Sequence, residues 1–220
     1  MEKSLKFLAR LRKNNDRDWF KANKDQYDEA REEFEEFVED LIRRIAAFDP
    51  DVIGTDPKDC LFRIYRDIRF SKDKSPYKTA FGAYIAPGGR KSMLPGYYIH
   101  IEPGGSFLAG GMHRPEANTL LAVRNAIAAD PKVLAKMEKS AAFRKYFDKI
   151  DSHEKLKTAP KGFDKDHPAI DYLRLKGYTV VHEMKKDVDI KDPRFAANAA
   201  KVFKAMKPLI DFLRAVSSKR

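Results

Sequence analysis

The residues best suited to chemistry lie in one basic stretch, which runs from Arg63 to Lys78 and reads RIYRDIRFSKDKSPYK. Arginine binds phosphate or carboxylate through a planar guanidinium with two parallel hydrogen bonds, and lysine adds a mobile positive charge. Serine and tyrosine hydroxyl groups between the cations offer neutral donors. The stretch therefore predicts a binding site for a small phosphorylated or carboxylated ligand. The predicted ligand-binding residues are Arg63, Tyr65, Arg66, Arg69, Lys72, Lys74, Tyr77 and Lys78.

The distribution of charge along the chain leaves an alternative for this stretch. The segment from Asp16 to Asp49 holds 12 acidic and 6 basic residues, whereas Lys58 to Lys91 holds 9 basic and 3 acidic residues. The arginines and lysines could therefore pair with the acidic segment, or could simply be solvated, instead of binding a ligand.

A second group of polar side chains falls on an expected strand from Tyr97 to Glu102. Because side chains alternate between the two faces of a strand, Tyr98, His100 and Glu102 share one face. An imidazole and a carboxylate two residues apart could act as acid and base. The sequence leaves the catalytic residues unknown, with His100 and Glu102 as the candidates. The alternative is that this face of the strand simply meets solvent.

No metal site and no cofactor are predicted. The remaining histidines, His113, His153, His167 and His182, lack the spacing of a metal motif. His182 shares an expected strand face with apolar residues, so we expect a hydrogen-bonded core histidine. Cys60 lies alone in an apolar run, which favours a small buried hydrophobic residue over a nucleophile.

Periodicity predicts the elements that would position these residues. A short helix around Leu5 to Leu11 precedes a long amphipathic helix from Asp16 to Asp49. Between Pro57 and Pro115 the period changes to two, which is typical of strands. The expected strands are Cys60–Arg66, Thr79–Ala86, Tyr97–Glu102 and Ser106–Met112, as an antiparallel meander. On the first of them, alternation places Phe62 and Ile64 on the face opposite Leu61, Arg63 and Tyr65.

Helices return after the meander. We expect helices at Glu116–Ala129, Pro131–Phe147 and Pro168–Leu175, a fifth strand at Tyr178–Met184, and a last helix from Asp192 that Pro208 kinks. The order predicts a single α+β domain spanning residues 1–220, with an antiparallel sheet of about five strands packed against N-terminal and C-terminal helices. Gly82, Gly110 and Gly111 lie inside expected strands, where glycine permits a bulge or the close approach of another group.

Three segments resemble the family known as domain of unknown function 2461. They are RIYRDIRFSKDKSPYK from Arg63, GYYIHIEPGGSFLAGG from Gly96, and KLKTAPKGF from Lys155. The resemblance implies an α+β domain found mainly in bacteria, and it implies no activity. His113 follows the glycine pair where the family pattern is more apolar, so the resemblance gives His113 no role.

Composition restricts the functional classes. The 220 residues are 43% hydrophobic and 35% charged, with no apolar run long enough to span a membrane. The N-terminus lacks the features of a secretory signal, so we expect a cytoplasmic protein. A net charge of +11 attracts anions. The leading interpretation is therefore anionic ligand binding, with catalysis left open. Non-specific nucleic-acid binding, and a protein-interaction domain that uses the acidic helix, are the alternatives.

Overall fold

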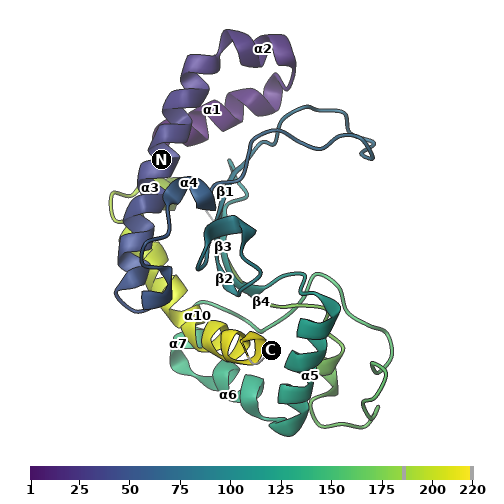
Figure 1. Cartoon of the computed structure of the whole chain (residues 1–220). Helices are drawn as coiled ribbons and strands as arrows, with labels where there is room; N and C mark the ends of the chain where they lie inside the picture. The colour runs from purple at the N-terminus through teal and green to yellow at the C-terminus, as the bar shows by residue number, and fades with distance from the viewer. Residues whose placement is uncertain (185–186, 219–220) are drawn as a thin grey trace. The chain divides into compact units, whose positions relative to one another are not determined.

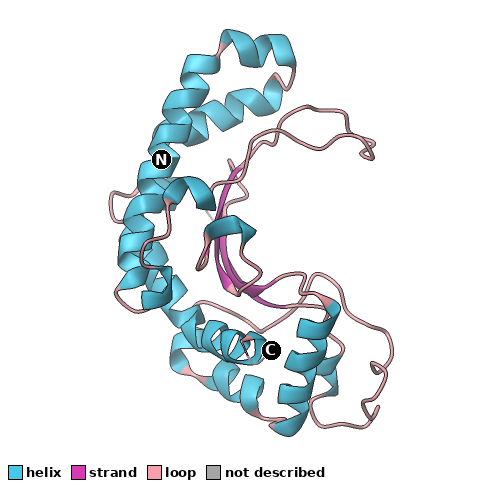
Figure 2. Ribbon diagram, viewed as in Figure 1, coloured by secondary structure: helices cyan, strands magenta, loops and turns pink. Residues whose placement is uncertain are grey.

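The computed structural model describes residues 1–184 and 187–218, which combine helices with one antiparallel sheet (Figures 1 and 2). The described residues hold ten α-helices and a four-stranded sheet of order β1-β2-β3-β4. The strands are β1 (Phe81–Ile85), β2 (Gly96–Ile101), β3 (Phe107–Met112) and β4 (Tyr178–Glu183). This confirms the α+β class, with four strands where about five were expected.

The first expected strand, Cys60–Arg66, is the one that does not form. Helix α4 (Pro57–Cys60) takes its start, because Asp56 accepts the Lys58 N–H and Pro57 suits the first helical position. Beyond Leu61 only isolated bridges occur, Leu61 with Ala83 and Tyr65 with Tyr77. On the partner segment Pro76 has no N–H to donate, which prevents a continuous ladder.

The burial of this segment differs from the expected alternation accordingly. Leu61 and Ile64 are both buried, although they were placed on opposite faces. Phe62, expected beside Ile64, is 41% exposed. The segment is therefore an irregular connection whose side chains face several directions.

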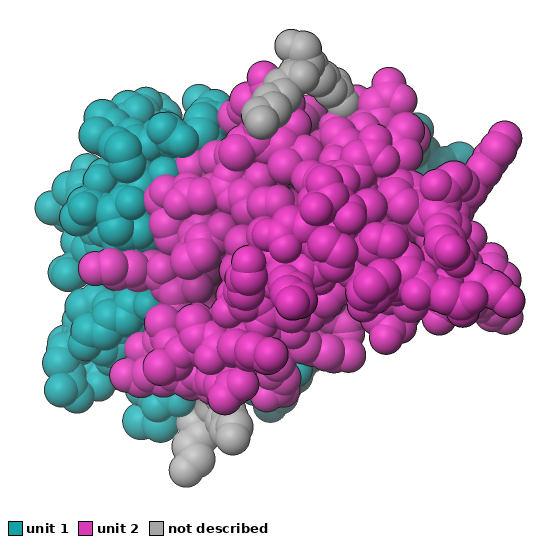
Figure 3. Space-filling model, turned by 90° about the horizontal axis from the view of Figure 1, so that it is seen from below, with its two compact units in different colours: residues 1–92, 98–108, 183–201 teal, residues 93–97, 109–182, 202–220 magenta. Residues whose placement is uncertain are grey.

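The chain divides into two compact units, which Figure 3 colours separately. Unit 1 comprises residues 1–92, 98–108 and 183–201, and unit 2 comprises residues 93–97, 109–182 and 202–220. Strands β2 and β3 each contribute residues to both units. The single domain over residues 1–220 stays a prediction.

In unit 1, helix α1 (Glu2–Lys13) confirms the expected first helix. Two helices, α2 (Arg17–Ala22) and α3 (Lys24–Ala46), replace the single long helix that was expected. Asp16 accepts the Trp19 N–H and so caps α2, and the chain breaks at Asn23 before α3. Phe34 of α3 stacks on Phe81 of β1 with ring centroids 5.4 Å apart. Helix α3 therefore covers the apolar face of β1. A short helix, α9 (Asp187–Lys191), also belongs to this unit.

In unit 2, the helices are α5 (Ala117–Ala129), α6 (Val133–Lys139), α7 (Ala141–Arg144), α8 (Ile170–Leu173) and the later part of α10 (Phe195–Ser217). The expected helix Pro131–Phe147 is divided at Ser140, whose hydroxyl caps α7. Tyr97 packs against Phe203 with ring centroids 5.2 Å apart. Pro208 lies inside α10 as expected, and the kink there stays a prediction. None of the described helices is long and apolar enough to cross a membrane.

Candidate functional site

The basic stretch forms an arm, residues 63–78, that is anchored to unit 1 at its base. Asn15 binds both backbone groups of Tyr77, through Oδ1 at 3.1 Å from the amide nitrogen and Nδ2 at 3.0 Å from the carbonyl oxygen. The Tyr77 ring stacks on Phe20 with centroids 4.0 Å apart and is 5% exposed. Tyr77 therefore anchors the arm, and its ring lies away from solvent. Tyr65 pairs with Tyr77 across the arm and is 51% exposed.

Arg66 and Arg69 pair with aspartates of the arm itself. The Arg66 guanidinium contacts the Asp73 carboxylate and donates to the Ser75 carbonyl oxygen at 3.2 Å. Arg69 donates to Asp67 through Nε at 3.0 Å and Nη2 at 2.7 Å. Neither pair involves the acidic segment from Asp16 to Asp49. These two arginines therefore shape the arm, and their charges are largely offset within it.

The lysines differ in their surroundings. Lys74 donates to the Ile68 carbonyl oxygen at 3.1 Å, and both Lys72 and Arg63 are exposed. Lys78 donates to the Arg63 carbonyl oxygen at 2.9 Å. Burial, and then the nearby Arg63 charge, lower the pKa of Lys78. Lys78 is thus a partly desolvated cation, and a nearby anion would stabilise its charged form.

The polar face of β2 carries a continuous chain of hydrogen bonds. The Tyr98 hydroxyl lies 3.0 Å from His100 Nδ1, and His100 Nε2 lies 3.2 Å from Glu102 Oε2. Thr79 donates to the other Glu102 oxygen at 2.8 Å. A neutral His100 with its proton on Nε2 satisfies both contacts, since it donates to Glu102 and accepts from Tyr98. The shared face predicted for Tyr98, His100 and Glu102 is confirmed.

The hydrogen-bonded side chains on this face of β2 are only partly accessible to solvent. The side chains of His100 and Glu102 are 20% and 30% exposed. Burial, followed by the Glu102 charge, raises the pKa of Tyr98 to about 12, so its phenol stays protonated at neutral pH. A Cβ on Gly82 would lie 2.7 Å from the Tyr98 hydroxyl oxygen. Gly82 therefore permits the close approach of another group, as its position in an expected strand indicated, and that group is the Tyr98 side chain.

Aromatic rings connect this face to the arm. Phe62 meets the Tyr98 ring edge-on with centroids 6.0 Å apart, and Phe107 stacks on His100 at 4.7 Å. Lys78 Nζ lies 5.7 Å from the centroid of the Phe62 ring. We call this group the sheet-face site; it consists of Phe62, Lys78, Thr79, Tyr98, His100, Glu102 and Phe107, all within unit 1.

Sequence reasoning found four of these residues and missed Phe62, Thr79 and Phe107. Thr79 directly follows the arm, and the antiparallel meander brings Phe107 beside His100. Both placements depend on the register between strands, which alternation along a single strand does not specify. These residues could therefore be found only from the tertiary structure.

Other groups considered in the sequence are placed elsewhere. Across the described ranges, no three His, Cys, Asp or Glu side chains gather as a metal site. Cys60 is buried, and burial raises the pKa of its thiol to about 12, as suits a small core residue. His182 is half-buried, and its Nδ1 donates a hydrogen bond to the Tyr146 carbonyl oxygen at 3.1 Å.

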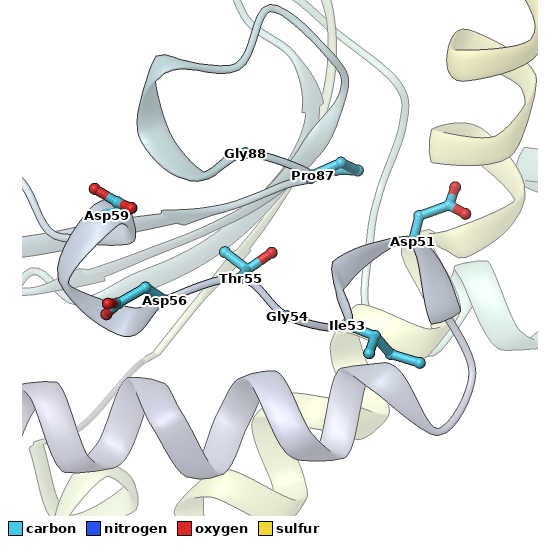
Figure 4. A pocket seen from close by; sticks show the side chains of 8 residues that line it. All are labelled: Asp51, Ile53, Gly54, Thr55, Asp56, Asp59, Pro87 and Gly88. Carbon is cyan, nitrogen blue, oxygen red and sulfur yellow. The ribbon is translucent and has the colours of Figure 1, made fainter.

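A hollow in unit 1 carries acidic residues but does not gather them. It has a volume of about 330 Å³ and includes Asp51, Asp56 and Asp59 in its lining. Figure 4 shows Asp51 on one side, with the carboxylates of Asp56 and Asp59 directed away from it. One Asp56 oxygen also caps α4. The hollow therefore lacks a convergent set of ligands.

Together these features define an α+β protein with a hydrogen-bonded tyrosine, histidine and glutamate on an antiparallel sheet, next to a basic arm. The chain belongs to the family of conserved hypothetical proteins DUF2461, whose model matches residues 3–212. The predicted family membership is confirmed. No curated protein and no solved structure matches the chain.

Proposed function

We propose that the sheet-face site binds a small phosphorylated or carboxylated ligand. The observation that supports this most directly is the position of Lys78, a half-buried cation over the Phe62 ring, which in turn meets the Tyr98 ring. Its ammonium donates to a backbone carbonyl oxygen and retains two further N–H donors. A bound anion would compensate the desolvation that lowers the pKa of Lys78.

The ligand's charged group would contact Lys78, with Arg63 supplying the more distant charge. Because Tyr98 donates its only hydroxyl proton to His100, its oxygen would accept a hydrogen bond from a hydroxyl group of the ligand. Phe62 and Phe107 would contact the uncharged part of the ligand. Both carboxylate oxygens of Glu102 already accept hydrogen bonds, one from Thr79 and one from His100.

The hydrogen-bonded residues Tyr98, His100 and Glu102 could also transfer a proton, which would allow the site to catalyse a reaction. A proton leaving the ligand would pass to the Tyr98 oxygen while the phenolic proton moves to His100 Nδ1. The imidazolium formed would then be stabilised by Glu102, which holds Nε2. This relay needs no phenolate, so the raised pKa of Tyr98 is compatible with it.

A titration of paired lysine variants tests the proposal. We expect Lys78→Gln to weaken binding of 3-phosphoglycerate or citrate by about 10-fold or more, because a charged hydrogen bond contributes about 1.5–3 kcal/mol. Tyr98→Phe should weaken binding less, since it removes a neutral hydroxyl group and no charge. Isothermal titration calorimetry at low salt would give both dissociation constants.

Lys74→Gln is the matched control. Lys74 also donates to a backbone carbonyl oxygen and belongs to the same arm. Its replacement by glutamine therefore removes the same charge and the same kind of hydrogen bond as Lys78→Gln. Equal weakening by both lysine variants would mean that only the general field of the arm attracts the anion. That result would reject a specific role for the sheet-face site.

A specific observation also supports nucleic acid as a second candidate. Phe70 is 96% exposed, and the Arg69 guanidinium carbon lies 5.9 Å from the centroid of its ring. An exposed ring among cations can stack on an unpaired base.

A further inference from the structure

Unit 2 contains a second pocket, with a volume of about 400 Å³, whose lining shares no residue with the sheet-face site. Its walls come from three segments: His113 to the first turns of α5, the stretch Ser152–Leu156, and Lys176 just before β4. All of these residues belong to unit 2, so the pocket lies within one compact unit.

Backbone pairing holds two of these walls together. Bridges join Asp151 to Thr179 and Lys155 to Leu175 in antiparallel register. The Leu156 N–H donates to the Arg174 carbonyl oxygen at 2.8 Å, and the Lys176 N–H donates to that of Glu154 at 3.1 Å. The pocket therefore has a wall fixed by main-chain hydrogen bonds, which favours a preformed site.

Positive side chains outnumber negative ones around this pocket. Arg114 Nη2 and Lys176 Nζ both contact Glu154, at 3.4 Å and 2.9 Å. Glu154 is the one carboxylate in the lining of this pocket, and two cations already share it. The lining therefore keeps a positive excess.

Arg124 is the strongest candidate for contact with a ligand. Its Nη2 donates to the Leu175 carbonyl oxygen at 3.0 Å, which fixes the guanidinium in place. Its Nε atom is buried and lacks a hydrogen-bond partner in the part of the chain that the structure describes. The positive charge of this fixed guanidinium, in the lining of the pocket, would attract the anionic group of a ligand.

Two histidines complete the polar side of the pocket. The His113 and His153 rings are both exposed, with centroids 6.3 Å apart. Burial, the Arg114 charge and then His153 lower the pKa of His113, whereas the Glu154 charge raises it. An anion between the rings would favour a proton on His113. The first turn of α5 adds the positive end of a helix dipole at the same wall.

Apart from Ser152, the remaining lining is apolar. Pro115, Ala117, Leu120 and Leu156 provide carbon surface in addition to the charged groups. A bare inorganic ion would leave this surface unused. We propose that the pocket binds a small organic anion that carries a carboxylate or a phosphate on an apolar body.

Four probes separate the parts of this proposal: phenyl phosphate, benzoate, inorganic phosphate and phenol. We expect phenyl phosphate or benzoate to bind at least 10-fold more tightly than inorganic phosphate and phenol. The tighter of the two organic anions identifies the charged group. Proton–carbon NMR of the histidine rings locates the binding, since His113 and His153 should shift while His167 and His182 stay constant.

The variant Arg124→Gln should weaken binding of the tighter probe at least 10-fold, and the exposed Arg144→Gln, outside the pocket, should leave it within twofold. If Arg124→Gln fails to fold, His113→Gln and His153→Gln replace it, because both rings are exposed. Equal affinity for phenol would overturn the proposal, as would constant His113 and His153 signals. A shift of His100 alone would assign the probe to the sheet-face site and reject the pocket.

Discussion

At the scale of single residues, Asp73 explains why the basic arm is less available to ligands than its sequence indicates. Its carboxylate accepts from the Ser75 amide at 2.9 Å and the Ser75 hydroxyl at 2.6 Å, and it also contacts the Arg66 guanidinium. Arg66 is thereby held across the turn of the arm. Arg66, one of the predicted ligand-binding residues, thus has a structural partner in Asp73, which lies four residues before the buried Tyr77.

These contacts predict an unusually acidic side chain. The Ser75 hydroxyl, the Ser75 amide and then Arg66 lower the pKa of Asp73 from 3.8 to about 2. Ser75→Ala should therefore raise the pKa of Asp73 more than Arg66→Gln does. Carboxyl carbon NMR between pH 1.5 and 6 measures both shifts. A larger effect of Arg66→Gln would mean that the ion pair, rather than the serine turn, holds the arm.

The sign of the accompanying stability change follows from linkage. The folded-state pKa of Asp73 lies below its unfolded value, so its contribution to stability is present above about pH 4. It is lost as pH falls from 3.8 toward 2. Because Asp73 is exposed, solvent screens its pair with Arg66, and we expect Arg66→Ala to change the free energy of unfolding only slightly.

At the scale of elements, Gly111 fixes how β3 lies beside β4. Its φ is +116°, and a Cβ there would overlap the Tyr178 carbonyl oxygen. A backbone oxygen within a sheet cannot turn aside as a side chain can. Glycine is therefore required at position 111 for two reasons, the positive φ and the close approach of the Tyr178 carbonyl oxygen.

Two alanine variants separate strain from overlap. Gly104 also has a positive φ, +75°, but a Cβ there meets nothing within 4 Å. Gly104→Ala should cost about 1–2 kcal/mol of backbone strain. Gly111→Ala should cost at least about 2 kcal/mol more, as buried overlap adds to strain. Urea unfolding of both variants checks this, and equal costs would show that the β3–β4 contact relaxes freely.

The elements also show what the sequence could predict. Alternation along β2 placed Tyr98, His100 and Glu102 correctly, because it is a local property of one strand. The first expected strand failed because a helix cap at Asp56 and a proline at Pro76 act on neighbouring segments. Likewise, the amphipathic pattern that predicted one helix from Asp16 to Asp49 did not reveal the break at Asn23. The contacts of the site with Thr79, Phe62 and Phe107 depend on strand register, which the sequence pattern did not specify.

At the scale of the whole molecule, a net charge of +11 acts on any polyanion. Within the arm, Asp67 and Asp73 offset the charges of two arginines. The rest of the excess is spread over several segments, and no recognised reading element for bases occurs among them. Such a charge distribution favours contact with phosphates and gives little discrimination among sequences.

Salt dependence and a ring variant test this expectation together. Binding to single-stranded DNA should weaken steeply with salt, with a log-log slope of about −0.7 for each phosphate contacted. Lys72→Gln should reduce the slope by about that amount, because Lys72 is an exposed cation of the arm. Phe70→Ala should weaken binding by about 1–3 kcal/mol while leaving the slope unchanged, since stacking releases no counterions. Fluorescence anisotropy with two unrelated oligonucleotides at 50 and 200 mM salt measures both quantities. Tight binding to one of the two sequences at the higher salt would contradict non-specific binding, and an unchanged affinity in Phe70→Ala would exclude stacking by the arm.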